Sequence, residues 1–290
     1  MTSKISELVE KGIVVTDGAW GTEMQNRGLS RGECPDSWNL TNPEKVEEVA
    51  RLYVDSGSRV ILTNTFGANR FVLGKFDLSE RAAEINTRGV EISRRAAGDS
   101  ALVFSSIGPS GKLLMTGEVT EDELRDAFTE QARAQSEAGA DAILIETMMD
   151  IEEALIAISA ARSTGLPVIA SMVFDSGKEK DRTMMGNTPE QMVEAFTQAG
   201  VDAVGTNCGQ GIAGFIPLCR RIRAATDLPV WIKPNAGLPE IVEGEVVYNT
   251  TPEEFASYIP DLVQAGASFI GGCCGTNDMF ISEIIRVLGS

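Results

Sequence analysis

Three of the five cysteines in this sequence have neighbours and a spacing that could bind a metal ion. Cys208 ends the run VGTNC, and Cys273 and Cys274 lie side by side in the run GGCCG. The sequence has no histidine, the commonest metal ligand, so a zinc site here must use cysteine, with at most an oxygen ligand in addition. Three cysteine ligands leave one tetrahedral position of zinc open, which is typical of a catalytic site.

The same cysteines admit two other interpretations. They could be small buried apolar side chains, or Cys273 and Cys274 could form a redox-active vicinal pair. A cysteine followed 65 residues later by a cysteine pair is not a local metal motif such as C-x-x-C. Cys34 precedes Pro35 in a loop, and Cys219 lies among apolar residues of an expected helix, so we expect neither to bind the metal.

Composition argues against several classes of function. Without histidine, Ser-His-Asp and Cys-His catalysis are excluded. The chain has 25 basic and 42 acidic residues, and a net charge of −17 would repel a phosphate backbone, so we expect no nucleic-acid partner. No apolar run reaches the ~18 residues of a membrane helix, and the N-terminal run MTSKISELVEKG lacks the apolar core of a signal peptide. We therefore expect a cytoplasmic protein without a membrane partner, and the odd number of cysteines argues against a disulfide framework.

Short β-branched runs alternate with longer segments whose apolar residues recur at helical spacing. The expected strands are 13–17, 59–65, 101–107, 142–147, 167–174, 201–208, 229–235 and 268–274. Expected helices include 44–56, 121–138, 151–163, 189–199, 212–225 and 252–265. Eight strand–helix units predict an α/β fold in one domain spanning residues 1–290, a single (β/α)8 TIM barrel. An open doubly wound sheet is the alternative, but no G-x-G-x-x-G follows the first strand.

A barrel of this kind places its chemistry at the carboxyl ends of its strands. Besides the cysteines, the candidate site residues at these ends are Asp17, Gly18, Asn64, Thr65, Glu146, Asn207 and Asn235. The cysteines end strands six and eight, which are separated only by strand seven, roughly two strand spacings of ~4.8 Å. Their loops can therefore converge on one metal ion. The strand-end carboxylates could instead be helix caps or loop anchors, and Asn64, Thr65 and Asn207 could be local loop staples.

With these residues placed, the sequence resembles the homocysteine S-methyltransferase family. The resemblance is strongest to the homocysteine-binding module of cobalamin-dependent methionine synthases, and its motifs run in order along nearly the whole chain. The matching runs are DGAWGT from Asp17, TNTF from Thr63, IGPSG from Ile107, IET from Ile145, TNC from Thr206, PNAGLP from Pro234 and GGCCGT from Gly271.

The resemblance implies a zinc-bound homocysteine thiolate that attacks an activated methyl group and yields methionine. It implies that Cys208, Cys273 and Cys274 are the zinc ligands, which also gives them the catalytic role. Asp17 and Glu146 then hold the amino-acid end of homocysteine, together with backbone amides that hold its carboxylate, and Asn235 occupies the open metal position when substrate is absent. Three thiolates overbalance the charge of Zn²⁺ and leave a fourth sulfur nucleophilic, which suits thiolate alkylation.

The methyl donor is less well specified by the sequence. The chain ends directly after the expected barrel, so we expect the donor to be a methylcorrinoid (methylcobalamin) carried by a separate corrinoid protein. S-methylmethionine and S-adenosylmethionine are alternatives, whereas the absence of a long C-terminal extension argues against betaine. Two further hypotheses stay open: a zinc-dependent component of a corrinoid system that acts on another methylated small molecule, and a non-catalytic zinc- or thiol-binding regulatory subunit.

Overall fold

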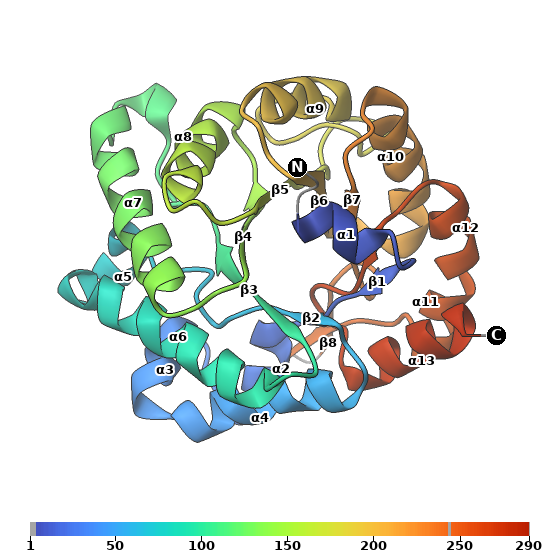
Figure 1. Cartoon of the computed structure of the whole chain (residues 1–290), viewed down its shortest axis with the longest axis horizontal. Coiled ribbons are helices and arrows are strands. Elements are labelled where there is room, and N and C mark those ends of the chain that lie inside the picture. Colours follow the sequence, from blue (N-terminus) through green and yellow to red (C-terminus); the bar gives the residue numbers. More distant parts are fainter. Residues whose placement is uncertain (1–3, 243–244, 290) are drawn as a thin grey trace.

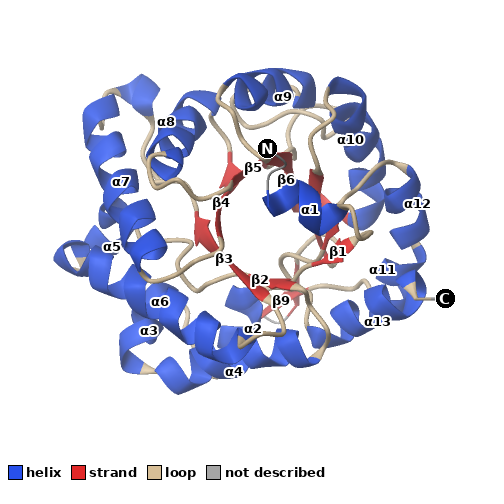
Figure 2. Ribbon diagram, viewed as in Figure 1, coloured by secondary structure: helices blue, strands red, loops and turns tan. Residues whose placement is uncertain are grey.

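Eight parallel strands form a ring that is surrounded by helices (Figures 1 and 2). The computed structural model describes residues 4–242 and 245–289. The strands of the ring are β1 (Val14–Val15), β2 (Val60–Ile61), β3 (Leu102–Ile107), β4 (Ala142–Met148), β5 (Val168–Met172), β6 (Ala203–Gly211), β7 (Val230–Asn235) and β10 (Phe269–Ile270). Their order is β1-β10-β7-β6-β5-β4-β3-β2, and a parallel bridge between Thr16 and Val60 joins the two ends. The predicted (β/α)8 barrel is therefore confirmed.

The described helices comprise an outer layer around the strands and α1, which lies across the ring (Figure 2). They are α1 (Lys4–Val9), α2 (Trp20–Asn26), α3 (Trp38–Thr41), α4 (Pro43–Asp55), α5 (Arg70–Gly74), α6 (Ala82–Ala97), α7 (Glu121–Glu137), α8 (Ile151–Arg162), α9 (Pro189–Gln198), α10 (Ile212–Ala225), α11 (Pro252–Ser257), α12 (Ile259–Gln264) and α13 (Asp278–Leu288). Within the described part of the chain, short 3-10 turns cover Pro35–Ser37, Ser79–Arg81 and Leu114–Thr116. Thr120 and Thr188 are the N-cap residues of α7 and α9, and each forms a capping box. The threonine side chain accepts from the backbone amide three residues later, and the side chain of that residue accepts from the threonine amide.

The structure differs from the expected elements in two places. The helix expected over 252–265 is divided into α11 and α12, because Pro260 has no N–H and cannot donate to the carbonyl one turn before it. Between β7 and α11 the chain forms a hairpin of β8 (Glu240–Val242) and β9 (Glu245–Val247), which was not predicted. This hairpin follows β7 at the carboxyl end of the barrel.

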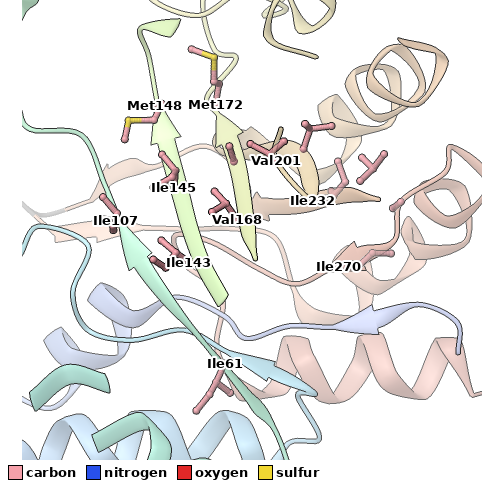
Figure 3. Packing of buried hydrophobic residues seen from close by; sticks show 14 of the residues in the cluster. Ile61, Ile107, Ile143, Ile145, Met148, Val168, Met172, Val201, Ile232 and Ile270 are labelled. Carbon is pink, nitrogen blue, oxygen red and sulfur yellow. The ribbon is translucent and has the colours of Figure 1, made fainter. Parts of the chain in front are cut away.

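One apolar core fills the space between the strands and the helices. Alternate strand residues such as Ile143 and Ile145 point to the same side and pack in this core (Figure 3). A second core fills the barrel itself, where the Trp231 ring lies 6.2 Å from Phe104 and 5.2 Å from Phe269 between centroids. Burial of aromatic side chains of this size contributes strongly to the stability of the barrel.

Helix α1 lies across the opening of the ring (Figure 1). Ile5 of this helix is 2% exposed and belongs to the interior core, and Leu8 and Val9 pack against that core. The amino-terminal end of the barrel is thus filled by apolar side chains, which leaves the carboxyl-terminal rim to carry a site. Among the described helices, none combines the length and apolar character needed to cross a membrane.

Candidate metal centre

The three predicted cysteines converge at the carboxyl-terminal rim. Cys208 lies in β6, whereas Cys273 and Cys274 lie in the loop between β10 and α13. Their Sγ atoms all lie within 4.8 Å of one another, with 3.9 Å between Cys208 and Cys274 and 4.0 Å between Cys273 and Cys274. A tetrahedral zinc ion with Zn–S bonds of ~2.3 Å requires sulfur atoms about 3.8 Å apart. The spacing of these sulfur atoms fits one zinc ion.

An irregularity in β6 turns Cys208 towards the other two cysteines. The pairing of β6 with β7 shifts register between Asn207 and Gly211, and Cys208 has a left-handed φ of 62°. Bulges of this kind re-aim a side chain, and they recur beside active sites. A non-glycine residue in the left-handed region carries backbone strain, which the surrounding structure must offset.

The cysteine pair is held against the end of β7 by backbone hydrogen bonds. The Cys273 amide donates to the Pro234 carbonyl at 2.7 Å, and the Ala236 amide donates to the Cys274 carbonyl at 2.9 Å. Glycine is required just before the pair, because a Cβ on Gly272 would lie 2.3 Å from Thr276 Oγ1. The local sequence GGCC therefore allows the backbone to approach its neighbours closely enough to place both sulfur atoms.

The protonation of the cluster also favours a bound cation. Hydrogen bonds from Cys208 and Cys273 lower the pKa of the Cys274 thiol to about 3. The same network of contacts raises the pKa of the Cys273 thiol well above its ordinary value. Three thiolates at this spacing would repel one another. A divalent cation that prefers sulfur, such as zinc, relieves this repulsion and allows all three cysteines to ionise.

Glu146 lies at the end of β4 on the same rim. Glu146 is 7% exposed, and its carboxylate accepts a hydrogen bond of 2.5 Å from Ser106 Oγ. Burial raises the pKa of Glu146, while the positive charge of Lys233 and the hydrogen bond from Ser106 oppose that rise. The neighbouring Thr147 has a φ of 60°, and the β4–β5 register shifts between Ile145 and Met148. A second bulge thus re-aims the strand end that carries Glu146.

Asn207 connects the two bulges. Its Oδ1 accepts hydrogen bonds from the Thr147 amide at 2.9 Å and from Ser171 Oγ at 2.6 Å. Its Nδ2 donates to Thr147 Oγ1 at 2.7 Å and to Glu146 Oε2 at 3.4 Å. Asn207 is fully buried, so these contacts fix Glu146 relative to Cys208, the residue that follows Asn207 in the chain.

Asp17 is completely buried at the end of β1. Its Oδ2 accepts from the Leu62 amide and from Trp20 Nε1, both at 2.7 Å, and its Oδ1 is paired with Lys233 Nζ. Lys233 was not predicted as a site residue, although a lysine inside the apolar run VWIKPN is a sequence signal that could have marked it. Lys233 is only 2% exposed, and a buried lysine requires a partner.

The other predicted residues lie around the rim in separate networks. Asn64 Nδ2 donates to the Pro35 carbonyl at 2.8 Å and to Asn39 Oδ1, and Thr65 Oγ1 donates to the Ser106 carbonyl at 2.7 Å. The polar groups of Asn64 and Thr65 are thus engaged with other parts of the chain. Gly18 allows close packing, since a Cβ there would lie 2.8 Å from the Tyr53 hydroxyl oxygen.

Asn235 and Tyr248 complete the surroundings of the cysteines. Asn235 Oδ1 is buried and has no hydrogen-bond partner within residues 4–242 and 245–289. An unsatisfied buried acceptor is costly, which is consistent with a ligand or metal partner at this position. The Tyr248 ring packs over Gly275, next to Cys274, and burial together with the nearby Cys274 charge raises the pKa of the Tyr248 hydroxyl. Tyr248 was not predicted, because nothing in its own segment indicates contact with the loop that holds the cysteine pair.

Comparison with known proteins identifies relatives whose sequence similarity extends along the whole barrel. The methionine synthase of Mycobacterium tuberculosis is 31% identical over 98% of this chain, and that of Mycobacterium leprae is 30% identical over 96%. The matches cover 25% and 24% of those proteins, so the chain spans about a quarter of the length of the curated relatives it matches.

Solved structures give the same fold. The metallated form of the homocysteine methyltransferase MmuM from Escherichia coli superposes with a TM-score of 0.82 at 23% identity, over 97% of this chain and 99% of that chain. Its apo form superposes with a TM-score of 0.74 at 22% identity, over 95% of both chains.

A family model supplies the remaining comparison. The model described as homocysteine S-methyltransferase matches residues 14–288, which include every predicted site residue. Together with the 31% identity to a methionine synthase, this match shows that the chain belongs to the homocysteine S-methyltransferase family of methyltransferase enzymes.

Proposed function

We propose that this chain is a zinc-dependent S-methyltransferase that methylates the thiolate of homocysteine to give methionine. The observation that carries the proposal is the convergence of Cys208, Cys273 and Cys274 at a spacing that suits one zinc ion. Membership of the family and the names of the relatives, methionine synthase and homocysteine methyltransferase, support homocysteine as the substrate.

The cysteines and Asn235 would form the metal-binding set. Cys208, Cys273 and Cys274 would supply three thiolates, which leaves one tetrahedral position for the substrate sulfur. Zinc, when bound, lowers the pKa of a fourth sulfur ligand and keeps it as a nucleophilic thiolate at neutral pH. Asn235 Oδ1 lacks a hydrogen-bond partner among the described residues, and it offers a neutral oxygen for that position when substrate is absent.

The carboxylates of the rim would hold the amino-acid end of the substrate. Glu146 is the more accessible, and among the described residues its Oε2 accepts only the 3.4 Å contact from Asn207 Nδ2. Asp17 already accepts from three donors, and a carboxylate has about four acceptor positions, so it can receive one more. Both carboxylates can therefore bind an ammonium group, while backbone amides near Gly18 and the polar rim around Asn64 and Thr65 would lie beside the substrate carboxylate.

The proposed donor is a methylcorrinoid carried by a separate protein. In the transfer, the substrate sulfur forms a new C–S bond with the methyl carbon while the cobalt–carbon bond breaks. The cobalt keeps the bonding electron pair, and no proton is needed because the attacking sulfur is already a thiolate. The similarity to methionine synthases, which extend far beyond the matched region, supports this donor.

Calorimetric titration with homocysteine tests the substrate. The zinc-loaded protein should bind homocysteine, and protein stripped of zinc by a chelator should lose most of that affinity. Absence of binding to the zinc-loaded protein would contradict the proposal and favour a different methylated substrate.

Turnover tests the donor. Incubation with homocysteine and methylcobalamin should produce methionine and reduced cobalamin in equal amounts. If S-methylmethionine or S-adenosylmethionine supports turnover and methylcobalamin does not, the methyltransferase assignment holds and the corrinoid donor is wrong.

A further inference from the structure

Ser106 lies in β3 and contacts Glu146 of the neighbouring strand β4. Its hydroxyl donates a hydrogen bond of 2.5 Å to Glu146 Oε1, and Ser106 itself is 1% exposed. In the β3–β4 register Ser106 is the partner of Leu144, a residue of the interior core. Glu146 lies two residues further along β4, so its side chain leaves the strand on the same face as that of Leu144. Ser106 and Glu146 are therefore diagonal neighbours inside the barrel.

The backbone of Ser106 is held from two directions. Its amide donates to Thr63 Oγ1 at 3.1 Å, and its carbonyl accepts from Thr65 Oγ1 at 2.7 Å. The same carbonyl accepts from Gln135 Nε2 of α7 at 3.0 Å. All four of these residues are buried, so the fold itself fixes the position of the Ser106 hydroxyl.

The two oxygens of the Glu146 carboxylate are unequal. Oε1 accepts the short bond from Ser106, whereas Oε2 has, among the described residues, only the 3.4 Å contact with Asn207 Nδ2. The torsion that turns a glutamate carboxylate is broad, so a bond to one of the oxygens is needed to select an orientation. Oε2 therefore keeps acceptor positions for a further donor.

The contact with Ser106 also helps Glu146 to remain charged. Burial raises the pKa of Glu146, and the positive charge of Lys233 and the hydrogen bond from Ser106 oppose that rise. An ionised carboxylate binds an ammonium group more strongly than a neutral carboxyl does, because both partners of the hydrogen bond are then charged. Ser106 thus supports both the orientation and the charge of Glu146.

We propose that Ser106 is a positioning residue that holds Glu146 Oε1 and so presents Oε2 to the ammonium group of the amino-acid substrate. The inference rests on the proposed function, because it takes Glu146 to bind the ammonium group of homocysteine. Ser106 acts only through Glu146, to which its hydroxyl donates.

A double-mutant cycle tests the proposal. Calorimetry measures homocysteine binding to the zinc-loaded wild-type protein, Ser106→Ala, Glu146→Gln and the double variant. Ser106→Ala should weaken binding by about tenfold, as expected for loss of a hydrogen bond to a charged group. Glu146→Gln should weaken it by about 30-fold or more, because one partner of a buried charge pair is lost. In the Glu146→Gln background, Ser106→Ala should have almost no further effect, since the carboxylate that Ser106 positions is already absent. Equal effects of Ser106→Ala in both backgrounds would overturn the proposal.

An analogue of homocysteine without the amino group shows which part of the substrate is affected. 4-Mercaptobutanoate has the thiol and the carboxylate of homocysteine but no ammonium group. The zinc-loaded wild-type protein and Ser106→Ala should bind this analogue equally well, so the preference for homocysteine should fall by about tenfold in the variant. A similar loss of affinity for both compounds would mean that Ser106 supports the rim in general, which contradicts the proposal.

Ser105→Ala is the matched control. Ser105 precedes Ser106 in β3, is also fully buried, and donates to the Ala142 carbonyl at 3.3 Å. Successive strand residues point to opposite faces, so Ser105→Ala should leave both homocysteine binding and the preference over the analogue unchanged. Ser106→Ala should bind zinc as tightly as the wild-type protein in competition with a chelator, since the Ser106 hydroxyl donates to Glu146 and not to a cysteine. Loss of zinc affinity in Ser106→Ala would count against a role confined to Glu146.

Failure of this proposal can be told from failure of the proposed function. If the zinc-loaded wild-type protein does not bind homocysteine, the proposed substrate is wrong, and the role of Ser106 falls with it. If the wild-type protein and Ser106→Ala bind homocysteine equally well, only the role of Ser106 is wrong.

Discussion

Lys233 and Asp17 form an ion pair inside the barrel, with 3% and 0% of their side chains exposed. The two residues are 216 positions apart in the sequence, yet they join β7 to the end of β1 across β10. The Lys233 ammonium also lies 5.9 Å from the centroid of the Trp231 ring. This pair therefore connects the interior core to the proposed substrate carboxylates.

Lys233→Met should destabilise the protein by about 3–5 kcal/mol, because the Asp17 carboxylate would remain buried without its partner. Urea unfolding monitored by circular dichroism measures the change. Arg133→Met is the matched control, since Arg133 pairs with Glu137 at the surface, where both side chains are mostly exposed. The control should cost less than about 1 kcal/mol. A similar loss in both variants would contradict the importance of the buried pair.

Cys208→Ser and Cys273→Ser should each lower zinc affinity by more than about 100-fold. Loss of a ligand should cost more than loss of a residue that only supports a ligand, which lowers affinity by about 10- to 100-fold. Zinc content after dialysis against a chelator, measured by atomic absorption, provides the check. Cys219→Ala is the control, because Cys219 is fully buried in α10 away from the cluster. Undiminished zinc content in the two serine variants would refute the ligand assignment.

Asn207→Ala should loosen the site and destabilise the fold together. The Thr147 amide and Ser171 Oγ would lose their acceptor, at a cost of about 2–4 kcal/mol. Zinc affinity should also fall by about 10- to 100-fold, because the bulge that aims Cys208 would lose its support. Asn39→Ala removes a buried amide of α3 that donates to the Asn64 carbonyl, and it should destabilise without changing zinc affinity. If both variants lower zinc affinity equally, Asn207 has no specific role in supporting the metal centre.

Asp36 should make stability depend on pH. Burial raises the pKa of Asp36 to about 7, although it accepts a hydrogen bond from the Gly67 amide at 3.0 Å. Because the folded state keeps its proton up to a higher pH than the unfolded state, stability falls as pH rises from about 4 to about 7. Ionisation of Asp36 should lower the free energy of unfolding by about 4 kcal/mol across this range, at 1.36 kcal/mol per pKa unit. Above about pH 7 its contribution no longer changes with pH.

Chemical unfolding of Asp36→Asn across this pH range tests the prediction. The amide retains an acceptor for Gly67 and cannot ionise, so the profile should become flatter than that of the wild-type protein. Asp122→Asn, at an exposed position of α7, should leave the profile unchanged. A wild-type profile with no fall between pH 4 and pH 7 relative to Asp36→Asn would show that Asp36 ionises normally.

The sequence predicted the barrel and the cysteine cluster for the same physical reason. Parallel strands bring their carboxyl ends to one rim. Residues at the ends of β6 and β10 therefore lie near each other whatever their separation in the chain. Cys208 and Cys274 are 66 positions apart and have sulfur atoms 3.9 Å apart. Strand periodicity placed these cysteines on one rim, and the family resemblance supplied their expected role as zinc ligands.

The contacts that refine the site could not be predicted in this way. The bulges beside Glu146 and Cys208 depend on hydrogen bonds that Asn207 makes across strands, and no local propensity encodes them. Tyr248 packs over Gly275, beside the cysteine pair, because it directly follows an unpredicted hairpin. Periodicity therefore predicts where a strand ends, whereas side-chain direction at that end depends on neighbours distant in the sequence.

The filling of the barrel by α1 has a consequence for the order of events in catalysis. With Ile5 and the aromatic core occupying the amino-terminal end, the amino acid and the methyl donor share one entrance at the opposite rim. A protein-borne donor seated on that rim would cover the entrance. Under the proposed function, homocysteine must therefore enter before the donor docks, and methionine must leave after the donor departs. Steady-state kinetics should show a compulsory-order mechanism in which excess donor protein inhibits turnover.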